Sequence, residues 1–83
     1  MSKKKITEPL SIHEMFLIIN RITRFLVNRP NKLYTIDYIF KKFKLRTKQQ
    51  TYNIMSNVMI SNKKIKKYKF GFKTLYCYDK ELI

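Results

Sequence analysis

The sequence of 83 residues is poor in the side chains that build disulfide-rich, metal-binding or catalytic domains. Its single cysteine, Cys77, can form no internal disulfide, and one thiol with one histidine, His13, is too few for a zinc site. We therefore expect no catalytic residues, no metal and no cofactor, in a protein of the reducing cytoplasm, or of the nucleus if the host is eukaryotic. The longest apolar run, Met15 to Ile19, is too short to span a membrane, and the start of the chain lacks the pattern of a signal peptide.

Acidic residues are scarce and unevenly placed. Nineteen Lys and Arg face five Asp and Glu, for a formal charge of +14, and no acid occurs between Tyr38 and Tyr78. Self-repulsion of this size destabilises a small compact domain, and a polyanionic partner relieves it. Nucleic acid is the predicted partner, because Lys and Arg displace the cations condensed on phosphates. An anionic membrane surface and a plain solubility surface are the alternatives.

The apolar pattern predicts one folded domain of mixed α and β structure. Hydrophobic residues make up 45% of the chain, with six Phe and six Tyr, which is too apolar for a disordered tail. Capping residues and 3.6-residue spacing predict helices over 12–28, 36–43 and 47–60, with a short extended segment at 33–34. Around the only glycine, Gly71, residues 65–70 and 72–78 predict a hairpin. Residues 1–10 are expected to form a flexible basic arm and residues 79–83 a short tail.

The first predicted helix carries more apolar surface than one core contact needs. Its central stripe consists of Met15, Ile19, Ile22 and Leu26. Further apolar residues flank the stripe on both sides, and a homodimer would bury them on a two-fold axis. The wing and tail could instead cover the excess. The side chains assigned to a dimer interface are Phe16, Ile18, Phe25 and Val27.

The order helix, short strand, helix, tight turn, helix, hairpin resembles the winged helix-turn-helix superfamily. Residues 11–78 carry the resemblance, with the helix-turn-helix at 35–58 and the wing at 65–78. It is a likeness of element order and spacing, without an invariant signature. It implies three helices plus a C-terminal wing, and the role of a small basic transcriptional regulator. The composition also resembles that of proteins coded by AT-rich viruses and plasmids.

The resemblance implies that the third helix enters the major groove of duplex DNA. Gln and Asn can pair with adenine there, and Lys with guanine. The predicted base-reading residues are Lys48, Gln49, Gln50, Tyr52, Asn53 and Asn57. The predicted backbone and wing contacts are Lys3, Lys4, Lys5, Arg46, Thr47, Lys66, Lys67, Lys69 and Lys73.

Other readings of the same residues stay open. The polar face of the third helix could simply be its solvent-exposed side. Lysines on an edge hairpin can serve to block pairing with a strand of another chain. Phe70 and Phe72, beside Gly71, could be exposed at the wing tip or fold back onto the core. The alternative functions are a protein-interaction module of a transcription or assembly complex, an RNA binder, and a nonspecific nucleic-acid binder.

Overall fold

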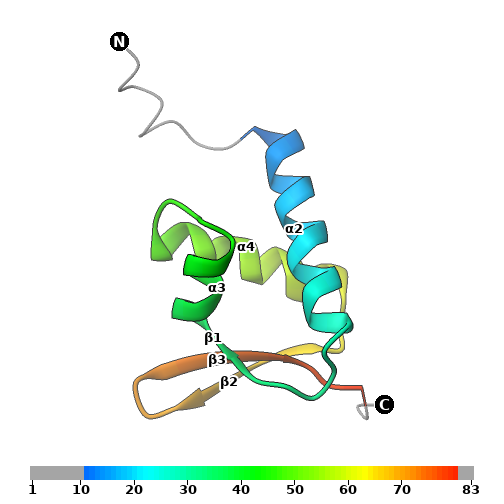
Figure 1. The fold of residues 1–83 in the computed structure, drawn as a ribbon, viewed down its shortest axis with the longest axis vertical. Coiled ribbons are helices and arrows are strands. Elements are labelled where there is room, and N and C mark those ends of the chain that lie inside the picture. The colour runs from blue at the N-terminus through cyan, green and yellow to red at the C-terminus, as the bar shows by residue number, and fades with distance from the viewer. Residues whose placement is uncertain (1–10, 81–83) are drawn as a thin grey trace.

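The computed structural model describes residues 11–80, which form three helices and a small antiparallel sheet. In chain order the elements are α2 (Ile12–Val27), β1 (Tyr34–Thr35), α3 (Ile36–Lys42), α4 (Lys48–Ser61), β2 (Ile65–Phe70) and β3 (Lys73–Tyr78). The helices lie on one side of the sheet, whose strand order is β1-β3-β2 (Figure 1). This is a winged helix of the α+β class, as the sequence predicts. The predicted basic arm 1–10 and residues 81–83 lie outside the described residues.

Each helix begins at a side chain that caps it. The Ser11 hydroxyl accepts from the Glu14 backbone nitrogen at 3.1 Å, and the Glu14 carboxylate accepts from the Ser11 nitrogen at 3.2 Å. Thr35 and Thr47 each accept at 3.0 Å from a backbone nitrogen three residues on, at the starts of α3 and α4. Each cap satisfies an otherwise orphan donor and stabilises the fold by about 1 kcal/mol. These caps account for helix starts within a residue of those predicted.

The turn between α3 and α4 is closed by a left-handed residue. Lys44 has a φ of 52°, and the Leu45 backbone nitrogen donates to the Phe40 carbonyl at 3.1 Å, as in a Schellman motif. Leu45 is buried and fills the corner between the two helices. A lysine at such a φ costs about 1 kcal/mol relative to glycine. Burial of Leu45 offsets that cost and helps to fix the angle between α3 and α4.

The core lies where α2, α3 and α4 meet the sheet. From α4 it takes Thr51, Ile54, Met55 and Val58, whose spacing of three and four residues places them on one face of the helix. From α2 it takes Ile19, Ile22 and Leu26 as expected, whereas Met15 is only partly buried. The buried face of α2 is therefore centred closer to Phe25 than the predicted stripe is.

Phe25 was assigned to a dimer interface, and that assignment is wrong. Its ring is only 9% exposed and packs against the rings of Tyr34, Tyr38 and Phe43, with centroids 5.0, 6.2 and 5.7 Å away. The helical period places Phe25 beside the core stripe but does not say that β1 and α3 pack on that side. The aromatic residues of these neighbours complete a pocket for Phe25 within one copy of the chain.

The sheet is held in a single register. Ile65 pairs with Tyr78 and Lys67 with Tyr76, and Gly71 takes a φ of 62° at the tip. Tyr34 of β1 pairs with Tyr76 on the other side of β3. Asn31 ties the loop after α2 to the end of β3, since its backbone nitrogen donates to the Tyr78 carbonyl at 2.8 Å. The wing is thus anchored at its base and extends freely only toward Gly71.

Within residues 11–80, no helix has both the length and the apolar character needed to cross a bilayer.

Candidate nucleic-acid interface

Between Lys48, its first residue, and Ile60, near its end, the exposed face of α4 is polar and carries no charge. Five side chains form it: Gln49, Tyr52, Asn53, Ser56 and Asn57. Four of them are among the predicted base-reading residues, and sequence reasoning missed Ser56. The 3.6-residue period could have found it, because residues 49, 53 and 56 lie on one stripe of a helix. We call these five residues the α4 face.

The carboxamides on the α4 face differ in their freedom to pair with a base. Gln49 Nε2 lies 3.5 Å from Asn53 Oδ1, a weak contact between two exposed side chains. Asn57 Nδ2 instead donates to the Asn53 backbone carbonyl at 3.0 Å, so it is turned back on its own helix. Gln49 and Asn53 therefore offer a donor and an acceptor together, which is what recognition of adenine N6 and N7 requires.

Gln50 departs from its predicted role. Its side-chain oxygen accepts from the Arg46 backbone nitrogen at 3.0 Å, and the residue is half-buried. Gln50 stands three residues after the cap Thr47, as in a capping box, but its side chain reaches one residue beyond Thr47, to the Arg46 nitrogen. With the oxygen committed to the turn, Gln50 can offer a base only its amide nitrogen.

Lys48 is held at the start of α4 by an ion pair with Asp37 of α3. The hydrogen bond from Lys48 lowers the pKa of the Asp37 carboxyl, and in turn Asp37 raises the pKa of Lys48. Both side chains are more than half exposed, so water screens the pair and its contribution to stability is small. Its structural effect is to restrain Lys48 beside an acid rather than leave it open to a phosphate.

The wing tip and the start of α4 lie side by side. Lys48 and Tyr52 of α4 line a surface hollow of about 270 Å³ together with Phe72 and Lys73 of the wing. In Figure 1 the wing extends along the same side of the molecule as the beginning of α4. The two segments therefore belong to one continuous surface, on which a single duplex could touch both.

The strand register separates the wing lysines into two sets. Lys67 and Lys69 pair with Tyr76 and Thr74, which are buried against the helices, so both lysines lie on the helix-facing side of the sheet. Lys66 and Lys73 pair with Cys77 and Phe70 and lie on the opposite side. All four are exposed. A ligand bound against α4 could therefore contact Lys67 and Lys69 on the helix-facing side of the sheet. It could also contact Lys73, which lies at the wing tip beside the start of α4.

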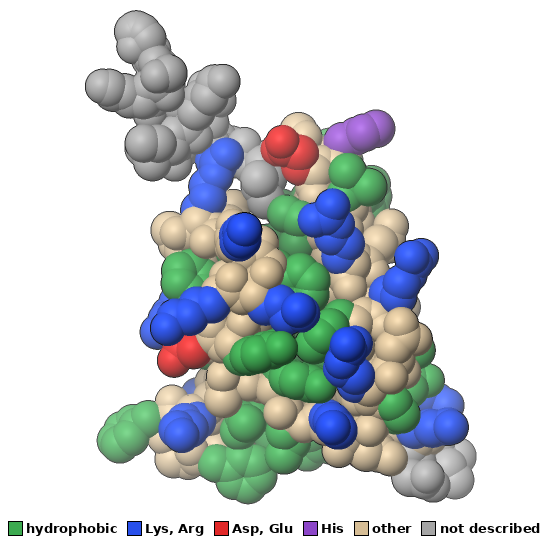
Figure 2. All heavy atoms as spheres, in the orientation of Figure 1, with side chains coloured by type: hydrophobic (Ala, Val, Ile, Leu, Met, Phe, Trp, Pro, Cys, Tyr) green, Lys and Arg blue, Asp and Glu red, His purple; other side chains and the backbone are tan. Residues whose placement is uncertain are grey.

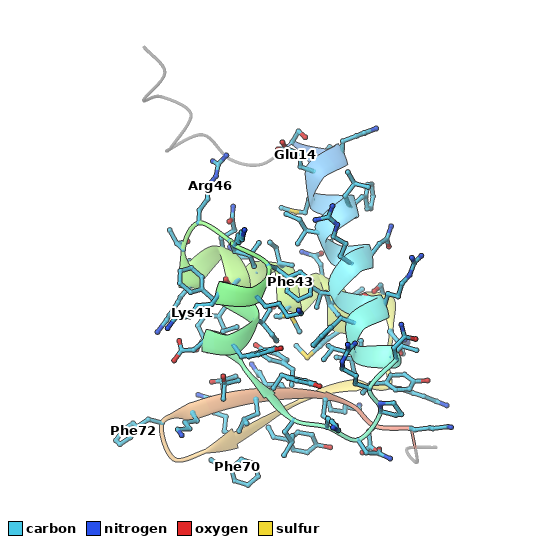
Figure 3. The ribbon with its side chains drawn as sticks, in the orientation of Figure 1. Glu14, Lys41, Phe43, Arg46, Phe70 and Phe72 are labelled. Carbon is cyan, nitrogen blue, oxygen red and sulfur yellow. The ribbon has the colours of Figure 1, made fainter. Side chains whose placement is uncertain are left out.

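Both phenylalanines of the wing tip are exposed. Phe70 is 60% exposed and Phe72 fully so, and Figure 3 shows both rings pointing away from the body of the molecule. The possibility that one of them folds back onto the core is thereby removed. Two solvated rings on a hairpin are a costly arrangement for an isolated protein, and they suit a surface that meets a partner.

The remaining predicted contacts are more scattered. Thr47 is exposed but its hydroxyl caps α4. Arg46 projects from the turn between α3 and α4, at the end of the molecule far from Phe72 (Figure 3). Lys3, Lys4 and Lys5 lie outside the described residues.

Of the four residues assigned to a dimer surface, only Phe16 is well exposed. Phe16 is 61% exposed, whereas Ile18 and Val27 are half-buried. Two exposed residues of α2, Ile12 and Leu17, were not on the predicted list. Homodimerisation stays a prediction.

No family model matches the sequence, and no curated protein matches it. The structure is similar to a solved chain of HOP2, from work described as concerning its DNA recognition and protein interaction domains and homologous DNA pairing. The TM-score is 0.59 at 20% sequence identity, and the match covers 75% of this chain and 98% of the HOP2 chain. At this identity the likeness shows a shared fold, which is the winged helix described above.

Proposed function

We propose that this protein binds duplex DNA through the α4 face and the wing, and that it acts as a sequence-specific regulator of transcription. The supporting observation is that one surface hollow is lined by α4 and the wing together: Lys48 and Tyr52 from α4, and Phe72 and Lys73 from the wing. A helix of about 14 residues fits the major groove, and a hairpin beside it can then reach the adjacent backbone. The likeness to HOP2, described as having DNA recognition domains, agrees with this assignment.

The division of labour follows from the chemistry of each segment. The α4 face offers carboxamides and hydroxyls, which can discriminate between base edges. The wing offers Lys67, Lys69 and Lys73, whose charges attract phosphates of any sequence. The ring of Phe72 stands fully exposed at the wing tip, beside the hollow shared with α4, where it can contact a sugar or an unstacked base step.

The test begins with a duplex selected by the full chain from a random pool. Fluorescence anisotropy then compares this duplex with a scrambled one for the wild type and for two variants. Gln49→Ala should weaken the selected duplex by about 1–3 kcal/mol and leave the scrambled one nearly unchanged, because a base contact is lost. Lys67→Ala should weaken both duplexes alike and reduce the salt slope by about 0.9, because one phosphate contact is lost.

Asn20→Ala, an exposed carboxamide on α2 away from the proposed interface, is the matched control for Gln49→Ala. The proposal fails if the pool yields no preferred duplex, or if Gln49→Ala and Asn20→Ala behave alike. Tighter binding to single-stranded RNA than to any duplex would instead favour an RNA-binding function.

A further inference from the structure

A groove between α2 and the end of α3 takes no part in the proposed interface. It encloses about 500 Å³ and is lined by α2 and by Phe43, with no residue of α4 or of the wing. Leu17, Phe25 and Phe43 give it apolar walls, and Arg21 and Arg24 give it charge. Figure 3 shows Phe43 pointing from the end of α3 toward α2. We call this feature the α2–α3 groove.

The positive charge of the α2–α3 groove comes from arginines, whereas that of the wing comes from lysines. The chain has four arginines and fifteen lysines, and three of those arginines, Arg21, Arg24 and Arg29, lie on α2 or just after it. Arg21 and Arg24 line the groove, and Arg29 lies over the Phe25 ring, 4.2 Å from its centroid. Lys42 lies over the same ring at 5.1 Å. Among the described residues, neither Arg21 nor Arg24 has a carboxylate within ion-pair distance.

Figure 2 shows this side of the molecule, with hydrophobic side chains gathered at its centre and basic side chains around them. Leu17 is 58% exposed and Phe43 is half-buried, so the apolar walls are open to a ligand. Arginine recognises carboxylates through paired hydrogen bonds and tolerates apolar surroundings better than lysine does. Apolar walls within a rim of arginines therefore favour a ligand that carries both carboxylates and a large apolar side chain.

We propose that the α2–α3 groove binds an acidic amphipathic segment of a partner protein. One aromatic or aliphatic side chain of that segment lies against Leu17 and Phe43, and its carboxylates pair with Arg21 and Arg24. A second copy of this chain is a poor occupant, because its described acids stand singly: Glu14 on α2, Asp37 on α3 and Asp79 just after β3. A duplex supplies phosphates but no large apolar side chain to fill the groove between Leu17 and Phe43. This inference does not depend on the proposed function, because the two surfaces share no residue.

The probe is a fluorescein-labelled helical peptide of about 15 residues, or four turns, with Asp and Glu on one face and Phe and Leu on the other. A second peptide has the same charges but Ala in place of Phe and Leu. Anisotropy is measured with the full chain at about 0.15 M salt, where charges on the surface are screened beyond about 8 Å. We expect the first peptide to bind about tenfold or more tightly than the second, since the apolar walls add contacts that charge alone cannot.

Two double variants separate the groove from the general positive charge. Arg21→Gln with Arg24→Gln should weaken the first peptide about tenfold, because both carboxylate partners are lost. Lys63→Gln with Lys64→Gln removes the same charge from the exposed turn after α4 and should change binding less than about twofold. Leu17→Gln alters an exposed residue, so the fold survives, and it should weaken the first peptide while leaving the second unchanged.

Equal binding of the two peptides, or equal losses in the two double variants, would overturn the proposal and leave only nonspecific attraction. Circular dichroism checks that each variant is folded. Duplex binding should fall equally in the two double variants. If the arginine variant instead loses duplex binding far more than the lysine variant, the groove is a nucleic-acid site and the proposal is wrong, whether or not α4 reads DNA.

Discussion

At the scale of single residues, the proposed interface depends on which cations are free to meet a phosphate. Lys48 lies at the start of α4, beside the wing tip, yet it is paired with Asp37. A carboxylate with the ordinary pKa of 3.8 is already charged at neutral pH, and the hydrogen bond from Lys48 lowers the pKa of Asp37 further. Asp37 thus keeps Lys48 from pairing with a phosphate, and its own charge repels phosphates from the middle of the proposed surface.

Replacing this acid should therefore strengthen DNA binding. In Asp37→Asn, Lys48 is released and one negative charge is lost, so duplex affinity should rise severalfold and the salt slope should steepen by up to about 0.9. The loss of an acid from the first turn of α3 should lower the stability by about 0.3–1 kcal/mol. Anisotropy titrations at several salt concentrations and thermal unfolding measure the two effects.

Asp79→Asn is the matched control, because Asp79 lies beyond the end of β3, where its carboxylate accepts from the Tyr68 hydroxyl at 3.3 Å. It removes the same charge at the base of the wing, away from Lys48 and the wing tip. If both variants strengthen duplex binding equally, the effect is one of net charge, and the placement of Lys48 in the interface is wrong.

At the scale of elements, most of the fold could be predicted from the sequence because each helix carries its own start signal. Ser11, Thr35 and Thr47 cap the helices where expected, and Gly71 sets the hairpin. What could not be predicted is how the elements pack on one another. Phe25 is buried because β1 and α3 lie on its side of α2, and Gln50 is engaged because the turn after α3 brings the Arg46 backbone within reach. Such contacts depend on tertiary placement, which periodicity does not encode.

The central strand makes a prediction about alkaline stability. Burial raises the pKa of Tyr76 on β3 from its ordinary 10.0 to about 12. Between these values the unfolded chain releases the phenolic proton while the folded chain keeps it, so the free energy of unfolding decreases as the pH rises. At about pH 11.5 the loss from this group should be about 2 kcal/mol relative to pH 9.

Urea unfolding of the wild type and of Tyr76→Phe at both pH values tests this expectation. The variant lacks the titrating group, while the other tyrosines and the lysines titrate in both proteins. The wild type should therefore lose about 2 kcal/mol more than the variant. Parallel losses would mean that Tyr76 does not resist ionisation in the folded state.

At the scale of the whole molecule, the charge of +14 is arranged on more than one surface. The α4 face and the wing combine uncharged hydrogen-bonding groups with lysines, which suits a duplex. The α2–α3 groove combines arginines with apolar walls, which suits an acidic segment of a protein. A protein with both surfaces could hold DNA and a partner at the same time.

The most direct measurement for the central proposal is an NMR titration of the ¹⁵N-labelled protein with a duplex of about 16 base pairs, or one and a half turns. Binding through the proposed interface predicts shifts or broadening of backbone amides at residues 48–57 of α4 and 67–73 of the wing, with α2 largely unaffected. Perturbations gathered on α2 and α3 instead, with the α4 amides unchanged, would contradict the proposal.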